Sequence, residues 1–194
     1  MDKIKLVFAS NNAHKIEEIQ QLVPEFVEIL SLQAINCLED IPETATTIAG
    51  NAQLKANYVT EKYGYPCFAD DTGLEIEALN GAPGVFSARY AGEPKNDKAN
   101  LEKVLENMAQ ETHRAAQFKT VICLNLNGLQ HLFTGIVKGN IALTPKGNQG
   151  FGYDPIFKAA GYDKTFAEMT MKEKSEISHR GKAVEQLVAF LQKM

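Results

Sequence analysis

Two adjacent carboxylates, Asp70 and Asp71, are the residues of this chain best placed to do chemistry. They follow a short apolar stretch, Tyr65 to Ala69, that predicts a buried strand, and Gly73 comes two residues later. Neighbouring aspartates repel each other, and a bound cation or a required proton transfer commonly offsets that cost. Ligands of α/β proteins bind at the carboxyl ends of strands, so this position suits an active site. The alternative is a solvated Asp-Asp-Thr-Gly turn.

A second polar stretch, Ser10 to Lys15, follows the apolar residues Ile4 to Ala9, which predict a central strand. It begins with a serine and two asparagines, which are types that cap helices, and apolar residues then recur at helical spacing until Pro24. A helix N-terminus binds anions because its free N–H groups and its dipole face the ligand, and Lys15 adds a positive charge. The alternative is a helix that is merely well capped.

Two further polar stretches lie in the C-terminal half. Gly147 to Asp154 contains three glycines and two aromatic residues. The glycines permit close approach to a ligand, and the aromatic rings can stack on a planar base, although a mobile surface loop has the same composition. Lys174 to Arg180 ends in Ser-His-Arg before an apolar-periodic helix. These side chains can donate hydrogen bonds to a ligand carbonyl or phosphate, whereas on an exposed helix they would carry no function.

The elements that must position these stretches alternate between strand and helix. A helix is expected from Thr47 to about Lys62, and Lys55 falls one position from its packing face, which predicts a surface lysine. Phe118 to Leu126 and Leu129 to Val137 predict two strands joined by the hairpin turn Asn127-Gly128. The pattern predicts an α/β fold with an antiparallel lobe beside it.

Composition narrows the class of protein. The chain has 194 residues, of which 44% are hydrophobic and 23% charged, as in an ordinary globular domain. Its formal net charge of -4 provides no basic field for a nucleic-acid polymer, and no apolar stretch approaches the roughly 20 residues of a membrane span. The N-terminus carries no signal-peptide pattern, and the three widely spaced cysteines predict buried thiols. These features favour the cytoplasm.

In combination, the polar stretches resemble the inosine triphosphate pyrophosphatase family, whose members hydrolyse non-standard purine nucleoside triphosphates. The matching stretches span almost the whole chain: Ser10-Asn11-Asn12-Ala13-His14-Lys15, Ala69-Asp70-Asp71-Thr72-Gly73-Leu74, Gly81-Ala82-Pro83-Gly84 with Ser87-Ala88-Arg89-Tyr90, Gly150-Phe151-Gly152-Tyr153-Asp154-Pro155, and Ser178-His179-Arg180. The resemblance implies one domain over residues 1–194. It also implies a mixed, bent central sheet flanked by helices, two lobes with an active-site cleft between them, and a homodimer.

The resemblance also implies roles for individual residues. Asp71 matches the catalytic carboxylate and metal ligand, and the implied cofactor is Mg²⁺. Implied substrate contacts are Ser10, Asn11, Asn12, Ala13, His14 and Lys15 at the triphosphate, Thr72, then Phe151, Gly152, Tyr153 and Asp154 at the base, and Lys174, His179 and Arg180. One position departs from the pattern, because relatives often carry Thr-Phe-x-Glu-Asn-Ala where this chain has Gly50 in place of the glutamate. A nearby acid such as Glu43 or Asp70, or water, would have to fill that gap.

The activity implied by the resemblance agrees with the residues. A nucleoside triphosphate needs a divalent cation together with N–H and lysine donors, and a carboxylate beside a metal is suited to deprotonate water. The expected reaction cleaves the α–β phosphoanhydride of ITP, dITP or XTP and gives the monophosphate and pyrophosphate. A Maf-like nucleotide pyrophosphatase of other specificity is one alternative. A catalytically weak nucleotide-binding protein is another, motivated by Gly50. The roles of Lys55 and Arg89 stay open.

Overall fold

The computed structural model describes residues 3–194, apart from the side chains of His14, Glu17 and Glu18. Its six-stranded sheet has the order β2-β1-β3-β4-β5-β6. Strand β1 (Ile4–Phe8) pairs in parallel with β2 (Val27–Leu30) and with β3 (Cys67–Ile76). Strand β5 (Leu129–Ile141) pairs antiparallel with β6 (Phe157–Ala159). The predicted α/β class, with a mixed sheet flanked by helices, is therefore confirmed.

The chain groups into two compact units. The first unit comprises residues 1–71, 120–134 and 182–194, and the second comprises residues 72–119 and 135–181. Strand β3 passes from the first unit to the second at Asp71, and β4 (Ala115–Leu126) and β5 also contribute residues to both. The residues of the candidate site are therefore divided between the units, and each group is described separately.

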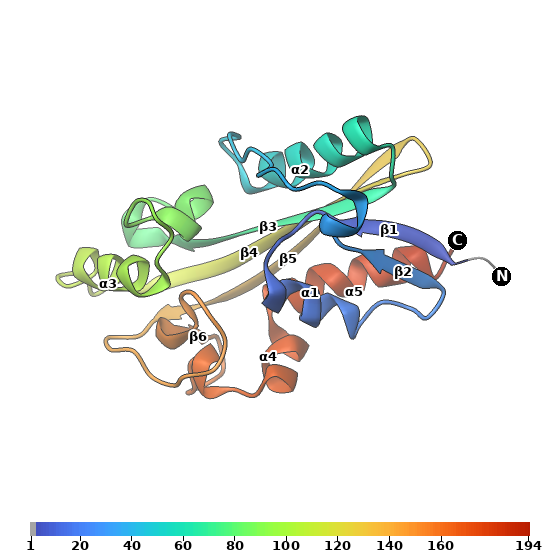
Figure 1. The fold of residues 1–194 in the computed structure, drawn as a ribbon. Helices are drawn as coiled ribbons and strands as arrows, with labels where there is room; N and C mark the ends of the chain where they lie inside the picture. The colour runs from blue at the N-terminus through green and yellow to red at the C-terminus, as the bar shows by residue number, and fades with distance from the viewer. Residues whose placement is uncertain (1–2) are drawn as a thin grey trace. The chain divides into compact units, whose positions relative to one another are not determined.

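Helices cover both faces of the strands in the first unit. Figure 1 shows α1 (Ala13–Gln20) and α5 (His179–Leu191) on one side and α2 (Ile48–Tyr63) on the other. Because both faces are covered, consecutive residues at the end of β1 are all buried, as expected of a parallel strand. The core under α1 and α5 includes Leu6, Phe8, Ile19, Phe68, Ile122, Leu124, Val184 and Leu187. Within it, the rings of Phe8 and Phe68 stack with their centroids 4.7 Å apart.

The second unit packs around a group of aromatic rings. Phe118 on β4 contacts Phe157 on β6 at 4.7 Å between ring centroids and stacks on Phe166 at 6.1 Å. Helix α3 (Asp97–Asn107) contributes its apolar stripe to this core, and α4 (Met171–Ile177) lies shortly before the start of α5. The remaining core residues include Leu74, Ile76, Leu101, Val104, Met108, Val137 and Ile156.

Strand β3 is longer than the sequence predicts. It continues through Asp70 and Asp71 to Ile76, so the Asp-Asp-Thr-Gly segment is part of a strand and the turn alternative is wrong. The reason is burial beyond the polar segment: Leu74 and Ile76 alternate into the core of the second unit and hold the strand there. The turn Asn127-Gly128 between β4 and β5 is confirmed, and both residues have positive φ, 52° and 76°, as a two-residue hairpin requires.

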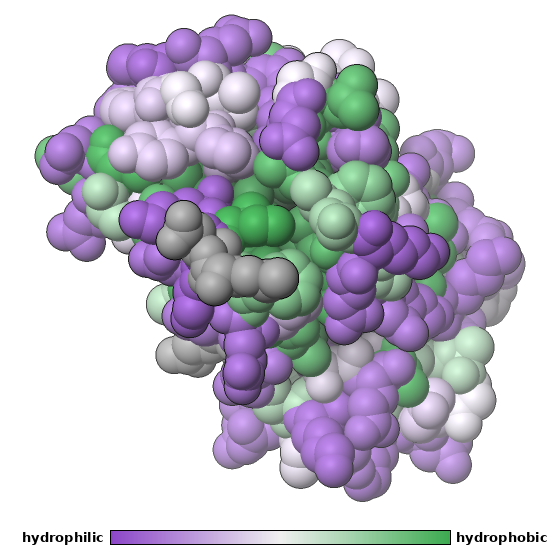
Figure 2. Space-filling view, turned by 90° about the vertical axis from the view of Figure 1, so that its right-hand side faces the viewer, coloured by the Kyte–Doolittle hydropathy of each residue, from purple (hydrophilic) through white to green (hydrophobic). Residues whose placement is uncertain are grey.

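The surface seen in Figure 2 is mainly polar, with an apolar area near the centre of the face turned to the viewer. Among the described residues, no helix is both long enough and apolar enough to span a bilayer. Cys37, Cys67 and Cys123 are buried and unbridged, as predicted. Burial raises the pKa of the Cys123 thiol to about 11, so this thiol is protonated at neutral pH.

Candidate active site

The two adjacent carboxylates lie on opposite faces of β3. Side chains alternate along a strand, so Asp70 shares the face of Phe68, under α1 and α5, and Asp71 faces α2. Each carboxylate accordingly meets a different lysine. Lys15 of α1 lies 3.0 Å from Oδ2 of the fully buried Asp70, and Lys55 of α2 lies 4.0 Å from Oδ1 of Asp71. The alternation of the strand therefore separates the two carboxylates.

Lys55 is the main residue that the sequence interpretation misjudged. The prediction of a surface lysine is wrong, because the side chain is only 9% exposed. Its ammonium donates to Oε1 of Glu43 at 2.7 Å and to the backbone carbonyl of Asp70 at 2.6 Å. Burial alone would lower the pKa of Lys55, but the negative charges of Asp70, Glu43 and Asp71 outweigh it and raise that pKa above its usual value. Lys55 is therefore a buried cation.

Asp71 is the carboxylate that remains least satisfied. Its side chain is 13% exposed, and among the described residues no donor reaches its Oδ2 atom. Burial raises the pKa of Asp71 to about 6, although the nearby charge of Lys55 opposes that rise. A buried oxygen without a donor and an acid with a raised pKa are both features of a site that acts on a ligand or a proton.

The Asp71 oxygen and the neighbouring Glu43 fit a magnesium ion. Mg²⁺ prefers oxygen ligands, keeps several waters and needs only one or two protein carboxylates. A cation at the unsatisfied Oδ2 atom would compensate it and keep Asp71 ionised. No group of three or more His, Cys, Asp or Glu side chains with metal-binding geometry occurs among the described residues, so a site of this kind would depend on water for its other ligands.

The loop that carries Glu43 is fastened to α2 at several points. The buried Asn51 accepts the N–H of Ala45 at 2.9 Å, and Thr47 caps the helix by accepting the N–H of Gly50 at 2.9 Å. At the far end of α2, Glu39 accepts hydrogen bonds from three side chains: Tyr58, Lys62 and Tyr63. These bonds hold the pKa of Glu39 well below its usual value, with Lys62 the largest contributor. Glu43 is thus held from both sides.

The stretch Ser10 to Lys15 adopts the predicted strand–loop–helix arrangement. Strand β1 ends at Phe8, Asn12 is the N-cap of α1, and its side chain accepts the N–H of Lys15 at 3.3 Å. Ser10 in turn accepts the N–H of Asn12 at 3.2 Å. Ala13 begins the helix and His14 follows it, with a side chain outside the described part of the structure. The backbone thus has the geometry of a helix N-terminus, while the Lys15 ammonium is held on Asp70.

In the second unit, the segment Phe151–Asp154 closes on itself. The Asp154 carboxylate accepts the Phe151 N–H at 3.0 Å and also the buried Lys174 ammonium at 2.8 Å. Lys174 lies 4.9 Å and Arg180 5.5 Å from the centroid of the Phe151 ring. Cations over an aromatic ring are attracted by its quadrupole, so this cluster is a connected arrangement of charges around one half-buried ring. The end of the Gly147 to Asp154 stretch is therefore held by these contacts, whereas residues 147–150 are exposed.

His179 and Arg180 begin α5, and both are buried, each with 3% exposure. The His179 ring stacks on Phe118 with centroids 4.6 Å apart and lies 6.3 Å from Phe166. The alternative of an exposed helix start is therefore wrong. The structure brings Lys174, His179 and Arg180 onto the same group of aromatic side chains that includes Phe151 and Phe166.

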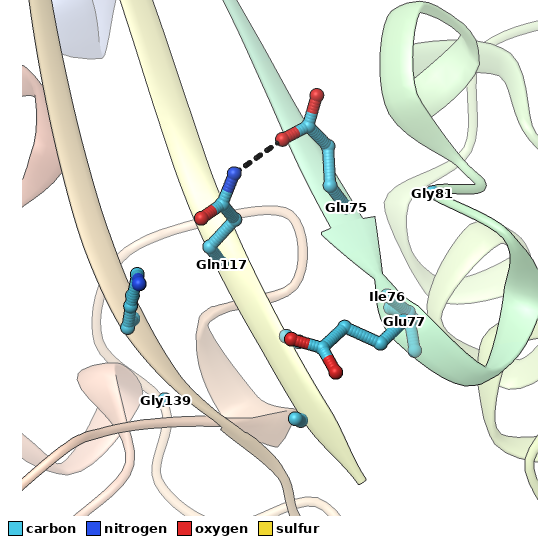
Figure 3. A pocket seen from close by; sticks show the side chains of 9 residues that line it. Glu75, Ile76, Glu77, Gly81, Gln117 and Gly139 are labelled. Atoms are coloured by element: carbon cyan, nitrogen blue, oxygen red, sulfur yellow. Dashed lines mark hydrogen bonds between the residues drawn. The ribbon is translucent and has the colours of Figure 1, made fainter.

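A cavity of about 300 Å³ in the second unit lies apart from the predicted site residues, none of which lines it. Its polar walls come from Glu75, Glu77, Gln117 and Lys138. Figure 3 shows Glu75 and Gln117 on adjacent strands, and the Gln117 amide donates to Glu75 at 2.7 Å. The residues that line this cavity include neither Asp71 nor its neighbours Lys55 and Glu43.

Some site residues were missed or stay unassigned. Lys55 could have been found from its spacing, because Asn51, Lys55 and Val59 recur every four residues and all three are buried on α2. Glu43 was named above as one acid that could replace the glutamate absent at Gly50, and the structure places its carboxylate 2.7 Å from the Lys55 ammonium. Thr72 follows Asp71 in β3 and is half-buried. Arg89 lies 3.7 Å from Glu93 and has no assigned role.

The fold and these clusters define an α/β protein with a buried acid–lysine centre in one unit and a charged aromatic cluster in the other. Residues 6–190 match the profile of the Ham1 family. A dITP/XTP pyrophosphatase of Flavobacterium psychrophilum is 66% identical over 187 residues, which cover 96% of this chain and 98% of that protein. This chain therefore belongs to the Ham1 family, which confirms the resemblance carried by the polar stretches and leaves the Maf-like alternative without support.

Solved structures agree with this assignment. The Ham1 protein of Staphylococcus aureus has a TM-score of 0.91 and 41% identity, with coverage of 97% of this chain and 98% of that one. A HAM1 protein from Coxiella burnetii has a TM-score of 0.92 and 41% identity, with coverage of 98% and 100%. Almost the whole chain therefore has the same fold as these Ham1 proteins.

Proposed function

We propose that this protein is a nucleoside-triphosphate pyrophosphatase that acts on the non-standard purine nucleotides dITP, XTP and ITP. The proposal is supported by membership of the Ham1 family and by the names of its relatives, including the Flavobacterium psychrophilum dITP/XTP pyrophosphatase. The products would be the nucleoside monophosphate and pyrophosphate. One water molecule is consumed, and the bond that breaks is the α–β phosphoanhydride.

The observation that carries the chemistry is the state of Asp71. In the absence of a metal, a carboxylate with a pKa of about 6 is ionised at neutral pH, and its Oδ2 atom, which no described donor reaches, is open to a cation or a proton. In the proposed reaction, Asp71 takes a proton from the attacking water. The positive charge of Lys55 partly compensates the negative charge of the Asp71 carboxylate. Asp71 and Glu43 are the residues that would hold Mg²⁺, which when bound supplies charge neutralisation for the triphosphate.

We assign the remaining predicted residues to substrate binding. The residues Ser10 to Lys15 would contact the triphosphate, because a helix N-terminus favours anions. Thr72, the segment Phe151–Asp154, and Lys174, His179 and Arg180 would contact the rest of the nucleotide. Buried donors such as these select a base by the hydrogen bonds that it can complete, and a base that leaves them unpaired is rejected.

Three further parts of the proposal concern the setting of the activity. We propose that residues 1–194 act as one pyrophosphatase domain, which is supported by the family match over residues 6–190. We also propose that the enzyme works as a homodimer. The cytoplasm is the proposed location, because a reducing compartment keeps buried thiols such as Cys37, Cys67 and Cys123 unbridged.

The test is a substrate panel with direct detection of pyrophosphate, in the presence and absence of Mg²⁺. We expect steady release of pyrophosphate from dITP, XTP and ITP and much less from dATP and dGTP. Asp71→Asn should reduce kcat by about 100-fold or more while the folded structure is kept. Tight nucleotide binding without turnover in the unaltered protein would instead support the nucleotide-binding alternative. Near-normal turnover of the Asp71→Asn variant would overturn the role of Asp71.

A further inference from the structure

The first turn of α3 holds the backbone of a segment that is distant in the sequence. The carboxylate of Asp97, the first residue of α3, accepts the N–H of Gly152 at 3.0 Å through Oδ2. Both residues belong to the second unit. Asn96, just before it, caps the helix by accepting the N–H of Ala99 at 3.0 Å, so the capping function of this helix end is already fulfilled by another side chain. Asp97 is therefore available for the contact with Gly152.

Gly152 lies at the centre of the segment Phe151–Asp154, whose other residues are also held. The Tyr153 hydroxyl donates to the backbone carbonyl of Ser87 at 2.6 Å, and the Asp154 carboxylate is bound to Lys174 at 2.8 Å. The contact with Asp97 acts on the peptide that joins Phe151 to Gly152, so it bears directly on where the Phe151 ring lies. Gly152 has a φ of +62°, a conformation that glycine adopts at no steric cost and that a single external bond can fix.

Helix α3 also holds the neighbouring segment of the same unit. Asn100, which is buried, accepts the N–H of Ala91 at 2.7 Å and donates to the carbonyl of Ala88 at 3.0 Å. One turn of helix thus fastens two different loops through two side chains, Asp97 to Gly152 and Asn100 to residues 88–91. The buried Asn100 consequently fixes the first turn of α3, so the backbone position of Asp97 does not depend on the contacts of its own exposed side chain.

From these contacts we propose that Asp97 is a positioning residue for nucleotide recognition, which fixes the Phe151–Gly152 peptide and through it the Phe151 ring. This rests on the proposed role of the segment Phe151–Asp154 at the base. Asp97 itself touches no reacting group. Its loss lets the segment move and weakens recognition of the base, while the triphosphate contacts and the catalytic carboxylate are unaffected.

The test compares Asp97→Ala, which removes the acceptor, with Asp97→Asn, which removes the charge and keeps an acceptor oxygen. The matched control is Glu102→Ala on the same helix, because Glu102 is exposed and pairs only with Lys98 at 3.8 Å among the ion pairs of the described residues. For each protein, kcat and KM are measured with ITP, and the inhibition constant is measured for inorganic triphosphate, which has no base. Thermal unfolding monitors the helix itself.

We expect Asp97→Ala to raise KM for ITP by about 3- to 10-fold, the range that one ordinary hydrogen bond supplies. We expect its inhibition constant for inorganic triphosphate to stay unchanged, Asp97→Asn to lie close to the unaltered protein, and Glu102→Ala to have no effect. If Asp97→Asn is as impaired as Asp97→Ala, the effect comes from charge at the helix terminus and the proposal is overturned. A parallel rise in the inhibition constant for inorganic triphosphate also overturns it.

A Phe151→Ala variant separates this inference from the proposed function on which it rests. If Phe151→Ala raises KM for ITP while Asp97→Ala does not, the role of Asp97 is wrong and the role of the segment stands. If Phe151→Ala leaves KM for ITP unchanged, the assignment of the segment to the base fails, and the role of Asp97 fails with it.

Discussion

Lys55 and Asp71 face each other at 4.0 Å in the first unit, and the two side chains are only 9% and 13% exposed. Even so, the pKa of Asp71 is raised to about 6, because burial of its carboxylate outweighs the attraction of the lysine. The surroundings of Asp71 in the first unit therefore oppose its ionisation. The ionised side chain lowers the stability of the folded protein, as residues kept for function often do.

The first prediction is that Asp71→Asn stabilises the protein without metal above pH 6. A pKa that is higher in the folded state than in the unfolded state means that folding is favoured when Asp71 is protonated. This contribution is complete below the unfolded pKa of about 4 and is lost as the pH rises through about 6. Asparagine removes the cost of burying the charge, so the variant should gain on the order of 2 kcal/mol at pH 8.

Chemical unfolding of both proteins from pH 4 to pH 8, with a chelator present, measures this difference. The gain should shrink as the pH falls through 6 and should be small at pH 4. Addition of Mg²⁺ at pH 8 should stabilise the unaltered protein more than the variant, if Asp71 binds the ion. An Asp71→Asn variant that is less stable at every pH would contradict the interpretation of Asp71 as a strained carboxylate.

The second prediction concerns the positive charge at Lys55. Lys55→Met keeps the length and apolar stem of the side chain but removes the charge that lowers the pKa of Asp71. The acid limb of kcat/KM should then move to higher pH by about one pH unit, and activity at pH 7 should fall. The measurement is a pH–rate profile at fixed Mg²⁺, with circular dichroism to confirm that the variant is folded.

Lys62→Met is the matched control for Lys55. Lys62 lies two turns further along α2 and also pairs with a glutamate of the preceding loop, Glu39, but its side chain is 52% exposed. This variant should leave the acid limb in place and change stability little, because the pair is exposed to solvent. An equal displacement of the acid limb in both variants would show that the effect is not local to Asp71.

The sequence predicts the groups of this site better than it predicts their surroundings. The stretches that contain Asp71, Lys174 and Arg180 were singled out from their polar residue types, and the family resemblance then implied a role for each residue. By contrast, the partners of Lys55 come from a loop and from a strand backbone, so no local pattern records them. The course of β3 was also missed, because aspartate and glycine are depleted in strands and only distant packing of Leu74 and Ile76 keeps the chain extended.

The third prediction separates stability from binding at Lys15. Its ammonium lies 3.0 Å from the fully buried Asp70, so Lys15→Met should cost about 3 to 5 kcal/mol by breaking that pair. The double variant Lys15→Met with Asp70→Asn should recover most of this stability, because no uncompensated charge is left. If Lys15 also contacts the triphosphate, the double variant should still bind it poorly.

Binding of inorganic triphosphate and of free inosine to the double variant checks this prediction. Affinity for triphosphate should fall, whereas affinity for the nucleoside should not change. Equal losses for both ligands would place Lys15 away from the phosphates and leave it with the structural role of pairing Asp70.

The fourth prediction concerns Gly50, the position that departs from the sequence pattern of the resemblance. A Cβ atom added at Gly50 would lie 2.7 Å from Cβ of Ala45 and 2.9 Å from Oγ1 of Thr47. Both contacts are too short, so a side chain at this position would push the loop away from α2. That loop carries Glu43, two residues before Ala45. The glycine therefore permits close packing of the loop that supplies Glu43 to Lys55.

Gly50→Ala should consequently destabilise the protein by about 1 kcal/mol, although alanine is favoured over glycine in a helix by a similar amount. The displaced loop should also raise the Mg²⁺ concentration needed for half-maximal activity, because Glu43 moves with it. The measurement is activity against Mg²⁺ concentration at saturating ITP, with unfolding followed in parallel. Gly64→Ala tests only backbone strain, because Gly64 has a φ of +74° and open space around it, so this variant should lose stability without any change in Mg²⁺ requirement. A more stable Gly50→Ala protein with an unchanged Mg²⁺ requirement would show that the loop does not depend on this close contact.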